Sequence, residues 1–191
     1  MNLCVYCGSG FGDDPAYLAA TVETGRLLAA EGVGVIYGGA KIGLMGALAD
    51  AALAAGGQVT GVIPTVLVER EIAHGGLTQS HVVEGMHQRK ALMADLSDGF
   101  VALPGGPGTL DEIAEQWVWA LLGIHKKPVG FLNIKGYFDP LRAMAERMAA
   151  EGFVSATHTG MLIFAETPAE LLARFRAYVA PPPKFEAAAE A

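Results

Sequence analysis

Short apolar runs alternate with longer helical stretches along almost the whole chain. The pattern predicts strands at residues 2–7, 33–37, 58–63, 81–84, 100–103, 128–133 and 161–164. It predicts helices at residues 15–31, 44–56, 87–97, 109–123, 138–151 and 167–179, with an irregular, charged stretch before residue 81. Strands that alternate with helices form a parallel sheet covered on both faces. The expected fold is therefore a doubly wound, three-layer α/β domain over residues 1–180, followed by a disordered tail at 181–191.

Helix-boundary signals support several of these assignments. Asp14 and Pro15 open the first helix, where proline suits the first turn, and Gly32 closes it at a left-handed position. Residues 167–170 (Thr-Pro-Ala-Glu) form a capping box, with proline at the first helical position of the last helix.

Charge and hydrophobicity restrict the partners of such a domain. Of the 191 residues, 52% are apolar and 17% are charged, and the formal net charge is −7. This charge disfavours broad nucleic-acid binding, although a local group of donors can still bind a small anion. The N-terminus does not resemble a secretory signal, and no apolar run approaches the roughly 18 residues of a membrane helix. We therefore expect a cytoplasmic protein that binds neither nucleic acid nor membrane.

Cys4 and Cys7 form a C-x-x-C pair within the first predicted strand. Three residues apart on a strand, their side chains point to opposite faces, whereas a redox pair occupies a turn and the start of a helix. A zinc site would need further ligands, and the chain has no second cysteine pair. We expect structural cysteines and no metal site.

Three glycine-rich loops follow strands whose carboxyl ends meet at one edge of the predicted sheet. They comprise residues 8–10, 38–43 and 104–109. Without a Cβ, the backbone can approach an anion closely, and the N–H groups at the start of the next helix point at it. Ligands of doubly wound sheets bind at this edge. The loops therefore predict a phosphate-bearing ligand.

Nucleotide-binding motifs narrow the class of ligand. The chain contains no G-x-x-x-x-G-K-[ST] motif, which excludes a phosphate-transferring P-loop. Residues 8–12 lack the G-x-G-x-x-G spacing, and the second strand ends in Tyr37 and two glycines, with no acid for a dinucleotide ribose. A mononucleotide fits these loops better than NAD.

Arg89 and Lys90 open a predicted helix, where each cation opposes the helix dipole by roughly 0.3–1 kcal/mol. A bound anion would reverse this penalty, and arginine offers a bidentate fork to phosphate or carboxylate. The alternative is that both side chains extend into solvent.

For Glu112 two interpretations also remain open. Residues 109–112 match a capping box, so Glu112 could cap the helix. Alternatively, its carboxylate lies beside a ribose and stabilises an oxocarbenium ion during N-glycosidic cleavage.

Two longer motifs resemble those of a known family. MHQRK at residues 86–90 and PGGPGTLDE at residues 104–112 match motifs of the LOG ("lonely guy") family in both order and separation, and LGIHKKP at 122–128 matches downstream. The family consists of cytokinin riboside 5'-monophosphate phosphoribohydrolases, and the resemblance covers nearly the whole chain. It implies a Rossmann-like homodimer that hydrolyses AMP or N6-prenylated AMP to free base and ribose 5-phosphate. We expect direct hydrolysis, without a metal or organic cofactor.

The resemblance also implies roles for individual residues. Arg89 and Glu112 become the catalytic pair, and Glu71 matches a position that contacts substrate. Together with the glycine loops, this gives as candidate substrate-binding residues Gly8, Ser9, Gly39, Glu71, Met86, Arg89, Lys90, Gly105, Gly106, Pro107, Gly108, Thr109, Leu110, Asp111 and Glu112. Pro107 stands where many relatives have tyrosine, and Val118 where many have threonine. Both changes bear on which base is preferred.

Two other functions compete with hydrolysis. Sequences of this kind are often labelled lysine decarboxylases, which would require a pyridoxal phosphate site and a Schiff-base lysine such as Lys41 or Lys90. Nothing in the sequence identifies a site for that cofactor ring. The second alternative is a non-catalytic nucleotide-binding carrier or sensor of related fold, in which the Arg89–Glu112 pair would be dispensable. Turnover of the bound nucleotide separates this alternative from a hydrolase.

Overall fold

Seven parallel strands form one sheet in the computed structural model, which describes residues 1–69 and 72–185. The strand order is β4-β3-β2-β1-β5-β6-β7. The strands are β1 (Asn2–Tyr6), β2 (Gly34–Tyr37), β3 (Val59–Pro64), β4 (Gln79–Val83), β5 (Gly99–Ala102), β6 (Val129–Leu132) and β7 (Leu162–Ala165). Every pairing between neighbours is parallel. The predicted doubly wound α/β fold is confirmed.

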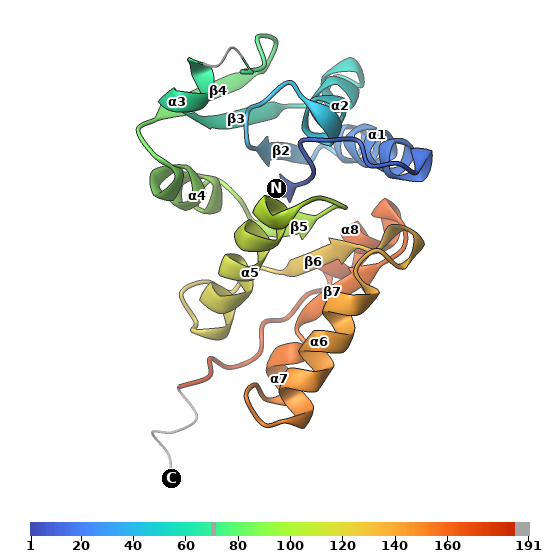
Figure 1. Cartoon of the computed structure of the whole chain (residues 1–191), viewed down its shortest axis with the longest axis vertical. Coiled ribbons are helices and arrows are strands. Elements are labelled where there is room, and N and C mark those ends of the chain that lie inside the picture. Colours follow the sequence, from blue (N-terminus) through green and yellow to red (C-terminus); the bar gives the residue numbers. More distant parts are fainter. Residues whose placement is uncertain (70–71, 186–191) are drawn as a thin grey trace.

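Six longer helices cover the two faces of the sheet (Figure 1). One face packs against α1 (Pro15–Ala30), α2 (Gly43–Ala54) and α8 (Pro168–Arg176). The other packs against α4 (Met86–Asp95), α5 (Pro107–Leu121) and α6 (Asp139–Ala150). Alternate residues of β1 contribute to the two cores, Leu3 and Val5 to the first and Cys4 and Tyr6 to the second. This alternation is what a strand buried on both faces requires.

Three short helical segments were not predicted. They are α3 (Thr65–Val68), which lies in the stretch expected to be irregular, η1 (Ile134–Gly136) and α7 (Ala156–Thr159). Segments of three or four residues are too short to display a helical period of hydrophobicity. The sequence therefore carries little signal for them.

The predicted helix-boundary signals are confirmed for α1 and α8. Asp14 Oδ1 accepts a hydrogen bond from Ala16 N at 2.9 Å, and Gly32 adopts φ +66° just beyond the helix. Thr167 Oγ1 accepts from Glu170 N at 3.2 Å, while a Glu170 carboxylate oxygen accepts from Glu166 N at 3.1 Å. These contacts satisfy backbone groups that a helix end leaves unpaired.

Cys4 and Cys7 are both buried free thiols, in agreement with a structural role. They belong to the cores on opposite faces of the sheet. Burial raises the pKa of the Cys4 thiol to about 12 and raises that of Cys7 as well. Neither thiol therefore supplies a thiolate near neutral pH.

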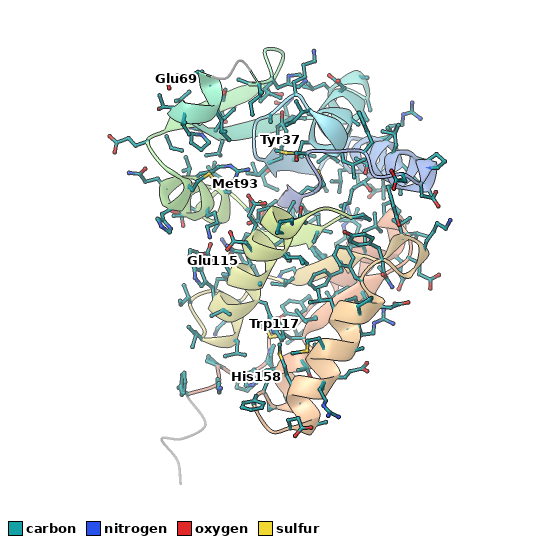
Figure 2. All side chains as sticks on the ribbon, in the orientation of Figure 1. Tyr37, Glu69, Met93, Glu115, Trp117 and His158 are labelled. Atoms are coloured by element: carbon teal, nitrogen blue, oxygen red, sulfur yellow. The ribbon has the colours of Figure 1, made fainter. Side chains whose placement is uncertain are left out.

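The described part of the C-terminal segment contacts two helices. Lys184 N donates to Leu121 O at 3.0 Å, and Pro182 O lies 3.0 Å from His158 Nε2. His158 O in turn accepts from Trp117 Nε1 at 3.2 Å, and Figure 2 shows these two labelled side chains close together. The predicted disorder of residues 186–191 falls outside the described residues.

No helix in the described ranges is long and apolar enough to cross a membrane.

The chain reverses its direction of winding between β1 and β5, which are neighbours at the centre of the sheet. Here the three glycine-rich loops meet. Gly8 N donates to Pro104 O at 3.1 Å, and Leu44 N donates to Gly8 O at 3.1 Å. A Cβ on Gly43 would contact the backbone of Ser9, so only glycine allows this close approach. The predicted convergence of the loops at one sheet edge is confirmed, and this is where ligands bind in such folds.

Candidate active site

A cavity of about 400 Å³ opens beside these loops. All three glycine-rich loops and the first turns of α4 and α5 contribute to its wall. The lining residues are Cys7, Ser9, Gly38, Ala40, Ile42, Met45, Leu67, Ile72, Arg89, Gly106, Pro107, Gly108, Thr109 and Glu112. The volume lies within the usual range for small-molecule sites.

The N-terminus of α5 forms one wall of this cavity. The helix begins at Pro107, with Gly106 as its N-cap and no side-chain cap. The capping-box interpretation of residues 109–112 is therefore wrong, because Thr109 already lies inside the first turn. Pro107 at the first helical position and the glycine before it determine the start instead. The first-turn amides of Gly108 and Thr109 are left for an anion in the cavity.

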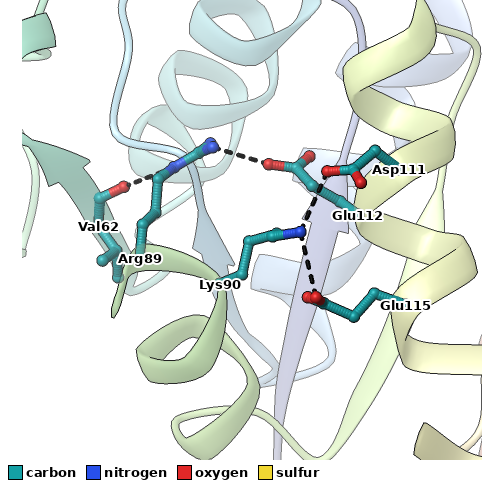
Figure 3. Close-up of polar contacts among 6 residues, drawn as sticks. All are labelled: Val62, Arg89, Lys90, Asp111, Glu112 and Glu115. Carbon is teal, nitrogen blue, oxygen red and sulfur yellow. Dashed lines mark hydrogen bonds and ion pairs between the residues drawn. The ribbon is translucent and has the colours of Figure 1, made fainter. Parts of the chain in front are cut away.

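Arg89 and Glu112 form a buried ion pair across the cavity (Figure 3). Arg89 Nη1 lies 2.7 Å from Glu112 Oε1, and the two side chains are only 8% and 11% exposed. Arg89 Nε also donates to Val62 O, within β3, at 3.2 Å. The guanidinium is therefore fixed by α5 and the sheet together. A Cβ on Gly38 would collide with its Nη2, so a glycine is needed there.

Burial gives the Glu112 carboxyl an unusual pKa. Removal from water raises this pKa above its ordinary value, while the neighbouring Arg89 charge and hydrogen bond oppose the rise. The guanidinium thus holds a carboxylate in a place where burial alone would favour the neutral acid. A carboxylate that faces a cavity and has a raised pKa is suited to stabilise a developing positive charge or to orient water.

Lys90 extends toward α5 on a different side from Arg89 (Figure 3). Its Nζ lies 3.1 Å from Glu115 Oε1 and 3.2 Å from Asp111 Oδ2. Burial lowers the pKa of Lys90, but the two carboxylates outweigh burial, and the pKa is raised. The alternative in which Lys90 extends into solvent is wrong, because the residue is buried, and Lys90 does not line the cavity. Its contact with a nucleotide stays a prediction of the family resemblance.

The other predicted site residues are distributed around the cavity. Gly8 and Gly105 line a neighbouring hollow of about 280 Å³, which shares Ser9 and Gly106 with the cavity. Gly39 provides a left-handed turn in the second loop, with φ +76°. Three further candidates do not line the cavity: Met86 and Leu110 are exposed, and Asp111 pairs with Lys90. Glu71 lies outside the described residues.

Seven cavity-lining residues were not among the sequence-based candidates: Cys7, Gly38, Ala40, Ile42, Met45, Leu67 and Ile72. Cys7 immediately follows β1, and Met45 lies in the first turn of α2. Gly38, Ala40 and Ile42 belong to the second glycine-rich loop, so the sheet-edge rule could have included all five. Leu67 and Ile72 belong to the stretch expected to be irregular. Only the family resemblance, through Glu71, pointed to that stretch as part of the site.

The chain matches one family model and is similar to named plant enzymes. The family model described as "Possible lysine decarboxylase" matches residues 45–175. Cytokinin riboside 5'-monophosphate phosphoribohydrolase LOG of Oryza sativa subsp. japonica is 44% identical over 185 residues, which cover 97% of this chain and 75% of that protein. LOG1 of Arabidopsis thaliana, which bears the same enzyme name, is 43% identical over 178 residues, covering 93% and 84%.

Solved structures with the same fold include proteins named for molybdenum cofactor. The molybdenum cofactor binding protein of Rippkaea orientalis superposes with a TM-score of 0.70 at 23% identity, covering 92% of this chain and 95% of that one. The molybdenum cofactor carrier protein of Chlamydomonas reinhardtii has a TM-score of 0.68 at 24% identity, covering 92% and 96%. At this level of identity the likeness concerns the fold alone.

Proposed function

The chain belongs to the LOG family, and on that premise we propose that it hydrolyses the N-glycosidic bond of purine nucleoside 5'-monophosphates. AMP and its N6-prenylated, cytokinin-type derivatives are the proposed substrates. The observation that carries the proposal is the buried Arg89–Glu112 pair in a cavity bounded by the N-terminus of α5. This cavity combines an anion-binding helix end with a carboxylate, the two groups that cleavage of a nucleotide monophosphate needs.

In the proposed reaction the 5'-phosphate binds at the first-turn amides of α5, around Gly108 and Thr109. The ribose then lies toward Glu112, one turn further along the helix. The C1'–N bond breaks with its electron pair going to the base, and Glu112 stabilises the oxocarbenium character of the sugar. Water adds to C1', and the proton that it loses balances the base anion. The products are free base and ribose 5-phosphate.

The decarboxylase description of the family model does not fit the cavity. Pyridoxal phosphate chemistry needs a lysine amine that can form a Schiff base. No lysine is among the described residues that line the cavity. Lys90 is held protonated by Asp111 and Glu115, which opposes nucleophilic attack by its amine.

Purified protein incubated with AMP or with isopentenyladenosine 5'-monophosphate should release base and ribose 5-phosphate in equal amounts. Chromatography of both products measures the reaction, and the ratio of kcat/KM values ranks the substrates. Adenosine, which lacks the phosphate, is the matched control and should react at least about 100-fold more slowly, because binding energy at the phosphate contributes to catalysis. Nucleotide binding without release from either monophosphate would favour the carrier or sensor alternative.

We also propose that the chain forms a homodimer through an apolar stripe on α5. Leu110, Val118 and Leu122 are 42%, 49% and 40% exposed, and Ile124 just beyond the helix is 63% exposed. The spacings of four and eight residues place the first three on one helix face. A continuous exposed apolar face of this kind is typical of a subunit interface. The partly buried Trp117 and Trp119 pack against the core instead.

The double substitution V118D/L122D should convert the dimer to a monomer, because it would bury two carboxylates at the interface without partners. Light scattering coupled to size exclusion, at micromolar concentration, measures the mass of the particle. V179D is the control, because Val179 is 85% exposed and follows α8, so it is not part of the stripe on α5. A wild-type mass equal to one chain, or a dimeric V118D/L122D variant, would contradict the proposed interface.

A further inference from the structure

His74 lies in the segment between α3 and β4 and is almost completely buried. Its Nδ1 accepts a hydrogen bond from Gly76 N at 3.0 Å, and its Nε2 lies 3.0 Å from Asp50 Oδ1. Because the backbone N–H can only donate, Nδ1 must be the unprotonated nitrogen. Nε2 therefore carries the hydrogen and donates it to the Asp50 carboxylate. Both ring nitrogens are satisfied, and the ring is fixed in one orientation.

The backbone of the same segment is hydrogen-bonded to the second glycine-rich loop. His74 N donates to Gly39 O at 2.9 Å, and Lys41 N donates to Ile72 O at 2.8 Å. Ala40 and Ala73 form an antiparallel bridge between these two bonds. Asp50 belongs to α2, the helix that follows the loop. The His74–Asp50 pair and these backbone hydrogen bonds therefore connect the segment, the loop and α2 to one another.

These connected elements form one side of the candidate active site. Ala40 and Ile42 from the loop and Ile72 from the segment line the cavity that Arg89 and Glu112 face. Neither His74 nor Asp50 lines it. We propose that His74 and Asp50 are positioning residues that hold residues 72–76 against the glycine loop and so maintain the nucleotide-binding wall of the cavity. This inference rests on the proposed function, because it names that cavity as the substrate site.

The exposure of Asp50 separates positioning from global stability. Its side chain is 58% exposed on the outer side of α2, so its removal opens no cavity in the core. What is lost is one hydrogen bond from the buried imidazole to a charged group, and with it the restraint on the segment. When residues 72–76 are held against the glycine loop in only a fraction of molecules, the apparent affinity for nucleotide falls by that fraction.

The D50A and H74A variants should each raise KM for the nucleoside monophosphate by about tenfold, while kcat changes little. The double variant should be no worse than either single variant, since both remove the same interaction. D50N should restore KM to near the wild-type value, because its amide oxygen still accepts from His74 Nε2. D95A, at an exposed aspartate in α4, is the matched control and should leave KM unchanged.

Amide hydrogen exchange gives a readout that does not depend on turnover. In D50A, the amides of Lys41, His74 and Gly76 should exchange faster, while amides of β1 and β5 stay protected. If the protein shows this exchange pattern but no hydrolase activity, the positioning role of His74 and Asp50 would stand and the proposed function would be rejected. Unchanged exchange at these three amides, or faster exchange throughout the sheet, would overturn the positioning role of His74 and Asp50. Additive KM effects in the double variant, or an unchanged KM in both single variants, would overturn it as well.

Discussion

The E112Q variant is expected to lose about 10²–10³-fold in kcat while it still binds nucleotide. Glutamine has nearly the same shape as glutamate, and its amide oxygen can still accept a hydrogen bond from Arg89 Nη1. What it lacks is the negative charge that would stabilise an oxocarbenium-like sugar. Because Glu112 is 11% exposed, little solvent is present to screen or replace that charge.

The measurement pairs single-turnover kinetics with calorimetric binding of ribose 5-phosphate to the same variant. Circular dichroism checks that the variant remains folded, since it leaves a buried guanidinium without a counterion. E115Q is the control on the same helix, where Glu115 pairs with Lys90 outside the cavity lining. It should keep kcat within a few-fold of wild type. Normal turnover by E112Q would remove Glu112 from the mechanism.

Local sequence signals predicted the sheet and most helix boundaries because those signals act over a few residues. Gly32 and Thr167 are examples, since each satisfies its own helix end. The start of α5 was misplaced because two local signals compete there. A capping-box pattern begins at Thr109, but Pro107 and the preceding glycine open the helix earlier. The loop before them is tied to the first glycine loop by the bond from Gly8 N to Pro104 O, a tertiary contact.

The candidate site shows the opposite case, because its contacts join residues far apart in sequence. Arg89 and Glu112 are 23 residues apart, and His74 and Asp50 are 24 apart. From the residues alone, Arg89 could have faced solvent and Glu112 could have capped a helix. The family resemblance selected these two as a pair, and the fold brings them into contact. It also directs the adjacent Lys90 into a separate ion-pair cluster, which no sequence pattern indicated.

The geometry explains why the two cations of the MHQRK motif are not equivalent. Arg89 binds both a sheet carbonyl and the carboxylate that faces the cavity. Lys90 links α4 to two acids on α5. Neighbouring residues on a helix point about 100° apart, so one faces the cavity and the other joins the two helices. The removal of Arg89 should therefore alter the chemistry of Glu112 directly.

The R89M variant should turn over nucleotide about 100-fold more slowly at pH 7, and its rate should rise as the pH is increased. Burial already raises the pKa of Glu112 above 4.5, and Arg89 opposes that rise. Without the guanidinium the pKa rises further, so that more of the carboxyl is protonated and inactive near neutrality. The acidic limb of the pH–rate profile should move to higher pH than in wild type. The double variant R89M/E112Q should lose this limb, because it has no acid to titrate.

Stability should follow the opposite trend in R89M. Removing one partner of a buried ion pair costs about 3–5 kcal/mol. The folded protein then binds the Glu112 proton more tightly than the unfolded chain does. Stability is accordingly highest below the unfolded pKa, which is near the ordinary glutamate value of 4.5, and falls as the pH rises through the folded pKa. Urea unfolding across this range measures the fall, with R89M/E112Q as the control that should not show it. A rate and a stability that rise together with pH in R89M would contradict the assignment of the titration to Glu112.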